Sequence, residues 1–440
     1  MQYSFDAPFE LLDRIQVEGF EAYFVGGAVR DFIMDKAFQD IDITTSAHPD
    51  EIKRIFSDCN VIDTGIKHGT VTVMYKNRPI EITTFRTELG YEDNRHPDKV
   101  VFCKNLSEDL KRRDFTVNSL CIDNKGEIID IFGGIEDIKS KTLKAIGNAE
   151  ERFKEDALRI LRALRFASVL GFDIDKNTAR AIHKCKDLIL NVANERIASE
   201  LRKMITGKNI RNILLEFSDV FSVVIPELAA CVGFEQHNFH HKYDVYTHIA
   251  TVVEASPEKD YIRLAALFHD IGKPLCFSLD ENGIGHFYSH AVKSSEIAVN
   301  TLKRLRFDNE TVNKVQLLVK QHDAYIDEDS KTLKRKLNRF GEQALRDLIS
   351  VQRADTLGLA NEYHKRLIHF SELEKVLDSI VENNNCFTVK NLDINGNDII
   401  AMGLKGKEIG DALNILLEAV IDEKVENCKE SLINYLKENS

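Results

Sequence analysis

Gln39-Asp40-Ile41-Asp42-Ile43-Thr44 alternates polar and apolar side chains, which predicts a short β-strand. Residues i and i+2 of a strand face the same side, so we expect Asp40 and Asp42 to point at one spot. Two carboxylates in one place require a cation. Mg²⁺ is the natural candidate, because it takes a few hard oxygen ligands and fills its other positions with water and phosphate oxygens.

The residues on either side of this segment indicate what the cation serves. Upstream, Val25-Gly26-Gly27-Ala28-Val29-Arg30-Asp31 offers glycines that let the backbone approach a phosphate chain and an arginine with a fork of donors. Downstream, Glu81 lies in a second alternating segment, Pro79-Ile80-Glu81-Ile82-Thr83-Thr84-Phe85-Arg86, and adds a third carboxylate. Three acids from two strands fit a two-metal site for nucleotidyl transfer. The alternative is a pair of solvated acids at a strand end, the usual meaning of an isolated Asp-x-Asp.

Further motifs follow in order over about two hundred residues, and with them the chain resembles the bacterial-type (class II) tRNA nucleotidyltransferases, which include CCA-adding enzymes and bacterial poly(A) polymerases. They are Lys111-Arg112-Arg113-Asp114-Phe115-Thr116-Val117-Asn118-Ser119-Leu120, Asp130-Ile131-Phe132-Gly133-Gly134, Glu155-Asp156-Ala157-Leu158-Arg159-Ile160-Leu161-Arg162-Ala163-Leu164-Arg165-Phe166 and Asn194-Glu195-Arg196-Ile197-Ala198-Ser199-Glu200-Leu201.

The resemblance implies template-independent addition of C, C and A to the tRNA 3′ end from CTP and ATP. Asp40 and Asp42 would hold Mg²⁺, with Glu81 assisting. The tRNA 3′ end and acceptor arm would be the partner. The residues implied to bind the nucleotide are Gly26, Gly27, Arg30, Arg113, Asp114, Asn118, Asp156, Arg159, Arg162 and Arg165.

Asp156 and Arg159 are predicted to lie three residues apart on one helix, hence as neighbours on its surface. Cytosine and adenine share an edge with an amino donor beside a ring-nitrogen acceptor, whereas guanine and uracil present the reverse. One carboxylate and one guanidinium can therefore accept C and A and reject G and U. In the family the matching residues pair with the incoming base. The alternative is an ordinary surface salt bridge.

Asp114 and Asn118 suit contact with a 2′-hydroxyl, since together they offer a donor and acceptors. The resemblance implies that these two residues and Arg113 orient the ribose and phosphates. Loop capping by Asp114 and Asn118 is the alternative.

The charged segment from Arg86 to Asp98 lacks apolar rhythm, which predicts a loop. In relatives, a loop here with an acidic pair before an arginine is needed to switch from C to A addition. This chain keeps Glu92, Asp93 and Arg95 but has Asn94 where glycine is usual, and Asn tolerates positive φ. We therefore favour full CCA addition. Bacterial poly(A) polymerase and A-only tRNA nucleotidyltransferase are the alternatives.

A second constellation, His248, the pair His269-Asp270, and Asp355, resembles the HD-family phosphohydrolases. The resemblance implies that helices bring the four side chains onto one or two metal ions, of which Mn, Ni or Fe suit imidazole ligands. His290 and His322 can extend the site to a second ion. This part would hydrolyse phosphomonoesters or 2′,3′-cyclic ends of damaged tRNA, or serve as scaffold. A further alternative makes the whole chain mainly an HD-type phosphohydrolase.

Hydrophobic rhythm predicts a multidomain chain. Short alternating runs dominate up to Ile131, with helical pieces near 8–19 and 48–57, and helical spacing follows from about residue 145 apart from a short hairpin around 276–287. We expect an α+β nucleotidyltransferase head with a small mixed, polymerase-β-like sheet, followed by all-α parts. The predicted domains are the head (1–145), a helical neck (146–235), an HD metal-binding domain (236–360) and a helical tRNA-binding tail (361–440).

Composition favours a cytoplasmic enzyme. Eight cysteines are scattered without a CxxC pair, no secretory leader is seen, and no segment approaches the ~20 apolar residues of a membrane span. A net charge of -12 argues against indiscriminate coating of nucleic acid, so RNA contact must be confined to basic tracks such as the run from Lys331 to Arg339. No obligate protein partner is inferred.

Overall fold

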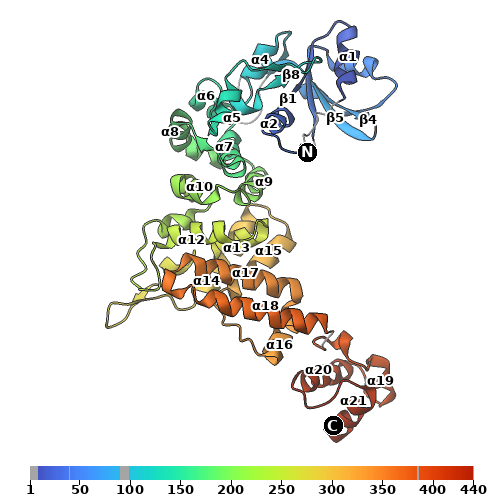
Figure 1. Cartoon of the computed structure of the whole chain (residues 1–440), viewed down its shortest axis with the longest axis vertical. Helices are drawn as coiled ribbons and strands as arrows, with labels where there is room; N and C mark the ends of the chain where they lie inside the picture. The colour runs from blue at the N-terminus through green and yellow to red at the C-terminus, as the bar shows by residue number, and fades with distance from the viewer. Residues whose placement is uncertain (1–7, 39, 90–98, 384–385, 440) are drawn as a thin grey trace. The chain divides into compact units, whose positions relative to one another are not determined.

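The computed structural model describes residues 8–38, 40–89, 99–383 and 386–439, and the chain divides into two compact units. Unit 1 is Met1–Ala229 with Arg304–Arg306, and unit 2 is Ala230–Lys303 with Phe307–Ser440 (Figure 1). The finer division into four domains stays a prediction. Glu92, Asp93, Asn94 and Arg95, on which the expected switch from C to A addition rests, lie outside the described residues.

A seven-stranded mixed sheet forms the first part of unit 1, in the order β3-β4-β5-β2-β1-β8-β9. Its strands are β1 (Ala22–Val25), β2 (Asp42–Thr45), β3 (Asn60–Gly65), β4 (Thr70–Tyr75), β5 (Arg78–Thr84), β8 (Cys121–Ile122) and β9 (Ile128–Ile129). Strands β2 and β5 run parallel, and the other neighbouring pairs are antiparallel. The predicted small mixed sheet is confirmed.

The centre of this sheet is apolar because alternate residues of its strands turn inward. Ile43, Val71, Val73 and Ile82 have no exposed surface. Helices α1 (Phe9–Val17) and α3 (Pro49–Ile55) pack against the strands, at the two places where the sequence predicted helical pieces. The packed sheet gives β2 and β5 fixed positions.

Two local predictions were wrong in this part of the chain. Strand β2 begins at Asp42, so Asp40 precedes the strand instead of lying within it. The expected loop from Arg86 to Asp98 starts with a strand, β6 (Arg86–Leu89), which pairs antiparallel with β7 (Lys99–Phe102). The polar composition of β6 predicts a loop, but the segment forms a strand because its backbone pairs with β7, which lies further along the chain.

Helices make up the rest of unit 1, in chain order α2 (Gly27–Ile33), α4 (Leu106–Lys111), α5 (Gly134–Lys139), α6 (Ala149–Glu155), α7 (Leu158–Leu170), α8 (Lys176–Cys185), α9 (Asn194–Ile205), α10 (Ile210–Glu216) and α11 (Ser218–Val224). Helix α7 packs on α9, and α6 packs on α8. The short parallel pair of β10 (Thr142–Leu143) and β11 (Asp173–Ile174) was not predicted.

Unit 2 is helical, as predicted, and its elements are α12 (Val245–Ala255), α13 (Asp260–Phe268), α14 (His290–Arg304), α15 (Asn309–Gln321), α16 (Ser330–Phe340), α17 (Glu342–Gly358), α18 (Arg366–Glu382), α19 (Gly396–Ala401), α20 (Lys407–Ile421) and α21 (Lys429–Glu438). The predicted hairpin is confirmed as β12 (Ser278–Leu279) and β13 (Gly285–His286). Helix α12 contacts both α13 and α17. Among the described residues, no helix combines the length and apolar character that crossing a membrane requires.

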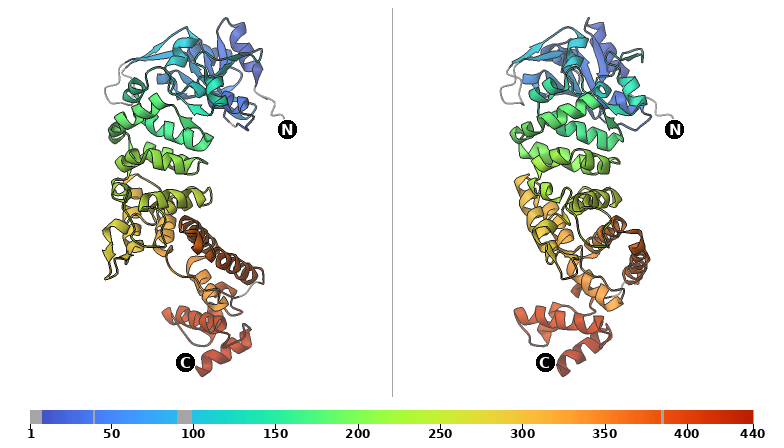
Figure 2. Two further views of the ribbon diagram at one scale, coloured as in Figure 1. Left: turned by 60° about the vertical axis from the view of Figure 1, so that its left-hand side comes forward. Right: turned by 90° about the vertical axis from the view of Figure 1, so that its left-hand side faces the viewer.

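The tail helices α19 to α21 surround an apolar cluster that includes Ile399, Leu416 and Leu432, and they lie together near the C-terminus (Figure 2). Two members of the basic run on α16 bond to this tail. Lys331 lies 3.2 Å from Glu423, and Arg335 bonds to Glu418 at 2.9 Å. In this structure these two cations attach α16 to α20 and to the turn that follows it, whereas the sequence suggested that they contact RNA phosphates.

Candidate active sites

The head carboxylates meet where two parallel strands run side by side. Asp42, the first residue of β2, is the direct register partner of Glu81 on β5. Residues opposite each other in neighbouring strands share a face of the sheet, so the two side chains point the same way. Asp40 stands two residues before Asp42 and is exposed, as is Glu81, whereas Asp42 is partly buried.

The charges of these acids act on one another. Burial raises the pKa of Asp42 to about 6, and the neighbouring charges of Glu81 and Asp40 add to the rise, while Arg113 opposes it. Asp42 and Glu81, with Asp40 two residues before Asp42, offer hard oxygen donors that a divalent cation would neutralise. The donor set therefore fits Mg²⁺.

Glycine is required beside these carboxylates. Gly26 has φ +84°, and a Cβ added there would lie 3.6 Å from Asp42 Oδ2 and 3.8 Å from an Arg113 guanidinium nitrogen. The next residue, Gly27, begins α2, and a Cβ on it would lie 3.6 Å from Arg30. The backbone here passes directly beside the acidic site.

Arg30, Asn118, Asp114 and Arg162 form a continuous polar chain. Arg30 donates to Asn118 Oδ1 at 2.7 Å, Asn118 Nδ2 donates to Asp114 Oδ1 at 3.1 Å, and Arg162 Nε donates to Asp114 Oδ2 at 2.8 Å. Burial opposes the charge of Asp114, but Arg162 and Asn118 hold the pKa of this carboxyl below its ordinary value. The chain joins α2, the 3₁₀ turn Thr116–Asn118 and α7.

Three arginines lie over the face of one aromatic ring, that of Phe166 on α7. Their guanidinium carbons are 3.9 Å (Arg165), 5.3 Å (Arg30) and 5.3 Å (Arg162) from the ring centroid. Arg165 also bonds to Glu200 on α9 at 2.5 Å. Phe166 thus brings three of the predicted nucleotide-binding arginines close together.

Asp156 and Arg159 do not lie on one helix, so that prediction was wrong. Helix α6 ends at Glu155 and α7 begins at Leu158, with Asp156 extended between them (φ -135°, ψ 103°). The reason is local: the Asp156 carboxylate accepts the backbone N–H of Leu158 at 3.1 Å and so caps the new helix.

Each of the two residues has its own support. Asp156 Oδ2 accepts from Arg196 on α9 at 3.3 Å, and Arg159 donates to Glu155 at 2.7 Å and to the carbonyl of Arg112 at 2.9 Å. These contacts, and not an Asp156–Arg159 ion pair, therefore hold the two side chains, so the alternative of an ordinary surface salt bridge between them does not apply. Arg196 lies in the motif at residues 194–201, but the motif alone does not indicate its contact with Asp156.

Asp109 is a further residue that sequence reasoning missed. It is fully buried on α4, where it accepts from Thr44 of β2 at 3.0 Å and from Arg112 at 2.9 Å, and it lies 3.4 Å from Arg113. It holds Arg113, which faces the carboxylates, against the central strand. A single acid in a polar stretch of the sequence gave no signal of this position.

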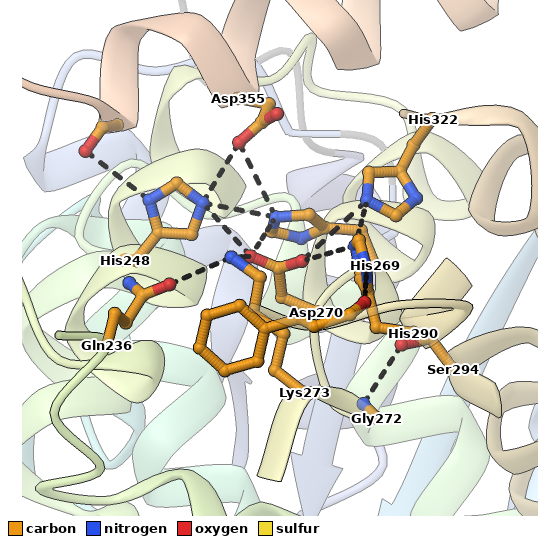
Figure 3. Close-up of polar contacts among 12 residues, drawn as sticks. Gln236, His248, His269, Asp270, Gly272, Lys273, His290, Ser294, His322 and Asp355 are labelled. Carbon is orange, nitrogen blue, oxygen red and sulfur yellow. Dashed lines mark hydrogen bonds and ion pairs between the residues drawn. The ribbon is translucent and has the colours of Figure 1, made fainter. Parts of the chain in front are cut away.

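The second site lies in unit 2, where α12, the turn after α13, and α17 converge (Figure 3). His248 Nε2 is 2.9 Å from Asp355 Oδ1 and 3.3 Å from Asp270 Oδ2. His269 Nε2 is 3.2 Å from Asp270 Oδ2 and 3.7 Å from Asp355 Oδ1. The structure brings together all four residues that the HD resemblance named.

Backbone carbonyls fix both imidazoles in orientation. His248 Nδ1 bonds to Gly358 O at 3.3 Å, and His269 Nδ1 bonds to Ala266 O at 2.7 Å, so each Nε2 is left to face the carboxylates. Burial lowers the pKa of His269, but Asp270 and Asp355 outweigh it and raise the pKa to about 10. Two oriented imidazoles and two carboxylates form a donor set that fits a transition-metal ion.

In comparisons with known proteins, three family models match segments along the chain. The "Poly A polymerase head domain" covers residues 22–144, the "Probable RNA and SrmB- binding site of polymerase A" covers residues 171–232, and "tRNA nucleotidyltransferase domain 2 putative" covers residues 284–436. These segments leave out residues 233–283, which contain His248, His269 and Asp270.

Some relatives match over nearly the whole chain, and others match more strongly over about half of it. The CCA-adding enzyme of Ligilactobacillus salivarius is 36% identical over 97% of this chain and 95% of its own, and that of Lactobacillus helveticus is 34% identical over 97% and 96%. The CCA-adding enzyme of Lactobacillus delbrueckii subsp. bulgaricus is 51% identical over 207 residues, 47% of this chain and 52% of that protein.

Solved structures match as well. The Bacillus stearothermophilus CCA-adding enzyme in complex with CTP covers 100% of this chain with 98% of its own at a TM-score of 0.71 and 29% identity. The Thermotoga maritima CCA-adding enzyme complexed with tRNA aligns over 98% of this chain and 94% of its own, with a TM-score of 0.60 and 20% identity, which shows a shared fold.

Proposed function

The chain belongs to the family of CCA-adding enzymes, and we propose which of its residues carry out the addition of C, C and A to the 3′ end of tRNA from CTP and ATP. The single observation that supports the assignment most is the register pairing of Asp42 with Glu81 beside Asp40. It provides a carboxylate cluster next to the glycine turn at Gly26.

Membership of a nucleotidyltransferase family implies dependence on a divalent metal, and we take it to be Mg²⁺ held by Asp40 and Asp42 with help from Glu81. When bound there, Mg²⁺ would activate the 3′-hydroxyl and stabilise the leaving pyrophosphate. The chain's own residues bind and orient the triphosphate. Gly26 and Gly27 leave room for it, and Arg113, held by Asp109, offers its positive charge to the phosphates.

The base would be selected by Asp156 and Arg159. The Asp156 carboxylate accepts a hydrogen bond from the amino group of C or A, and the Arg159 guanidinium donates to the ring nitrogen. Two contacts favour this role: Arg196 on α9 holds Asp156, and Glu155 on α6 holds Arg159. The two side chains are therefore kept in place without pairing with each other. Protein side chains thereby replace a template.

The ribose would be recognised through the chain of Arg30, Asn118, Asp114 and Arg162. Asp114 accepts from Asn118 and from Arg162 through different oxygens, so its position is fixed before nucleotide arrives. A fixed acceptor next to an amide suits a 2′-hydroxyl.

Poly(A) synthesis and A-only addition are distinguished from CCA addition by the products. Purified protein with Mg²⁺ would be given tRNA transcripts that end before CCA, after C, or after CC, together with each labelled NTP singly and all together. We expect C, C and A followed by a halt. Long A tails on unrelated RNA would indicate a poly(A) polymerase, and A addition only to the CC-ended transcript would indicate an A-adding enzyme.

We propose a second activity for unit 2, a metal-dependent phosphohydrolase. The observation that favours it is the group of His248, His269 and Asp270, with Asp355 beside both imidazoles and with both imidazoles oriented by backbone carbonyls. A transition ion such as Mn, Ni or Fe suits these ligands and would activate a water molecule.

The test of this activity is hydrolysis of bis-p-nitrophenyl phosphate and of a 2′,3′-cyclic nucleotide with added Mn²⁺ or Ni²⁺, in the wild type and in His269→Ala. Loss of hydrolysis in the variant supports the activity. Equal hydrolysis by both proteins assigns it to a contaminant.

We place the enzyme in the cytoplasm. All eight cysteines are free, which suits a reducing compartment, and tRNA maturation takes place there.

A further inference from the structure

We propose that Tyr288 forms a nucleobase subsite in the cavity of unit 2, with Arg366 on the same wall to meet the phosphate, so that this cavity selects phosphate esters by their base. This specificity rests on the phosphohydrolase activity proposed above for unit 2, and it adds the residues that choose the substrate.

The cavity beside the histidine and aspartate cluster of unit 2 has room for a nucleotide. Its volume is about 420 Å³, and Asp270, His290, His322 and Asp355 form part of its wall. This volume lies within the range of about 300–1,000 Å³ that is typical of small-molecule sites. A phosphate group that binds beside these four residues would leave the rest of the ester against the remaining wall.

The remaining wall includes an aromatic ring that is open to solvent. Tyr288 lines the cavity, and 73% of the residue is exposed. Its ring lies parallel to that of His286, with an interplanar angle of 6° and 5.4 Å between the centroids. His286 Nε2 is in turn 3.1 Å from Asp280 in the turn of the hairpin. One face of the Tyr288 ring is therefore supported, and the exposed ring can receive a planar group on the other.

A strained turn holds Tyr288 close to the cluster. Ser289 separates Tyr288 from His290 and has φ +63°, a left-handed conformation that residues with a side chain rarely adopt. Such conformations cost free energy and are concentrated at active sites and ligand clamps. The turn places the exposed ring and the cluster residue on the wall of one cavity.

Arg366 offers a positive charge on the same wall. It begins α18, and its guanidinium carbon is 5.8 Å from the centroid of the Tyr363 ring. Within the described part of the chain, Arg366 forms no ion pair with an acid. Lys273, by contrast, is bonded to Asp270 at 2.7 Å and to Gln236 at 2.8 Å. Arg366 is therefore the cation of this wall that is available to a phosphate.

A nucleoside phosphate uses all of these features together. Every nucleobase has a flat π face, and stacking on an aromatic side chain typically strengthens binding by about 10-fold or more. A phosphate ester without a base would contact Arg366 and the cluster but would leave Tyr288 exposed. The supported ring, the available cation and the cluster on one cavity wall therefore favour an ester that carries a base.

Binding without turnover tests the subsite directly. The full chain would carry Arg159→Ala, which removes the proposed base contact in the head, and would be freed of metal with EDTA so that no ester is cleaved. Isothermal titration would compare adenosine 2′,3′-cyclic phosphate with methyl ribofuranoside 2′,3′-cyclic phosphate, which has the same phosphate but no base. We expect the adenosine ester to bind about 10-fold more tightly.

Substitutions in this parent locate the effect. Tyr288→Ala should remove the advantage of the adenosine ester and leave the affinity for the ester without a base unchanged, whereas Tyr288→Phe should keep the advantage. Arg366→Ala should weaken the binding of both esters alike, by about 5-fold.

Tyr325→Ala is the matched control. Tyr325 is 75% exposed and stacks on His369 with 5.4 Å between the ring centroids, but it lies outside the cavity wall. This variant should bind both esters as the parent does, and melting curves of all variants would show that they fold.

The outcomes separate the subsite from the phosphohydrolase activity. Equal affinity of the parent for the two esters, an unchanged advantage in Tyr288→Ala, or an equal loss in Tyr325→Ala overturns the subsite. Hydrolysis with Mn²⁺ is measured separately on the same parent. Base-dependent binding without hydrolysis overturns the phosphohydrolase and keeps the subsite, whereas hydrolysis of both esters with equal KM overturns the subsite and keeps the phosphohydrolase.

Discussion

Asp42 and Glu81 stand opposite each other in register on two parallel strands, β2 and β5. Parallel pairing fixes the two carboxylates relative to each other through the backbone, so neither depends on a flexible loop for its position. Asp40, by contrast, precedes the strand and is exposed. The three acids therefore differ in how firmly the fold holds them: the sheet fixes Asp42 and Glu81, whereas Asp40 joins them from the segment before β2.

Removing one charge from this cluster should weaken the metal site without abolishing it. Glu81→Gln should raise the Mg²⁺ concentration that gives half-maximal single-turnover incorporation by about 10-fold, roughly 1.4 kcal/mol of lost cation stabilisation. Glu127→Gln, an exposed acid elsewhere in unit 1, is the control and should leave the Mg²⁺ dependence unchanged. Equal Mg²⁺ curves for Glu81→Gln and wild type would remove Glu81 from the site.

Substitution of Arg159 should damage nucleotide choice and spare tRNA binding. Arg159→Ala removes the donor to the base edge, so kcat/KM for CTP and ATP should fall by about 10- to 100-fold, as expected for a lost base contact of about 1–3 kcal/mol. The dissociation constant for tRNA should stay within about 2-fold of wild type. Arg180→Ala on α8, where Arg180 bonds to Lys176 and Asn177 of its own helix turn, is the control. Equal losses in nucleotide use and tRNA affinity would contradict base reading by Arg159.

The Arg162–Asp114 pair should make stability depend on pH in a defined direction. Arg162 and Asn118 hold the pKa of Asp114 below its unfolded value, so the pair stabilises the fold above that unfolded value and loses its effect as pH falls through the folded one. Arg162→Ala leaves a buried carboxylate without its cation. The loss at pH 7 should be about 3 kcal/mol at most, because a third of the Arg162 side chain is exposed.

Thermal unfolding of wild type and Arg162→Ala at pH 7 and pH 5 measures this effect. The gap in melting temperature should narrow at pH 5, because without Arg162 burial raises the pKa of Asp114 in the variant, so that protonation relieves the uncompensated carboxylate there. Adding Asp114→Asn to Arg162→Ala should restore part of the melting temperature at pH 7. A gap that is the same at both pH values would mean that the pair acts through packing alone.

The site in unit 2 depends on a glycine that the sequence did not single out. A Cβ added to Gly358 would lie 2.8 Å from His248 Cε1 and Nδ1, and 2.9 Å from Val252. Gly358→Ala should displace His248 and weaken Mn²⁺ binding in unit 2 by at least about 10-fold. Gly410→Ala on α20 has open space around the new methyl group and should leave Mn²⁺ binding unchanged while stabilising the fold by about 0.5–1 kcal/mol. Isothermal titration with Mn²⁺ compares the two variants.

Short-range patterns in the sequence predicted the strands of the sheet and the motif of possible metal ligands. The alternation around Ile43 and Ile82 predicted two strands of the mixed sheet, and the motif around His269-Asp270 predicted a cluster of possible metal ligands in a helical part. The sequence did not show that Asp156 breaks the helix, because Glu155-Asp156-Ala157-Leu158 reads as continuous helix until the capping bond to Leu158 is seen.

Other features depend on contacts between distant segments. Asp109 meets Thr44 only when α4 packs on the sheet, and Arg335 meets Glu418 only when the tail folds against α16. A carboxylate or a guanidinium in a polar stretch has the same local signature whether it is solvated, paired or bound to ligand. For these residues the partner, and hence the role, becomes visible only in the structure.

The most direct test of the account is incorporation by Asp42→Asn on tRNA transcripts that end before CCA, after C and after CC. One metal site is proposed to perform all three additions. The variant should therefore lose all of them alike, by about 100-fold or more in kcat, with CTP affinity kept within a few-fold. Loss of C addition with A addition retained, or normal incorporation at every step, would contradict a single catalytic site built on Asp42.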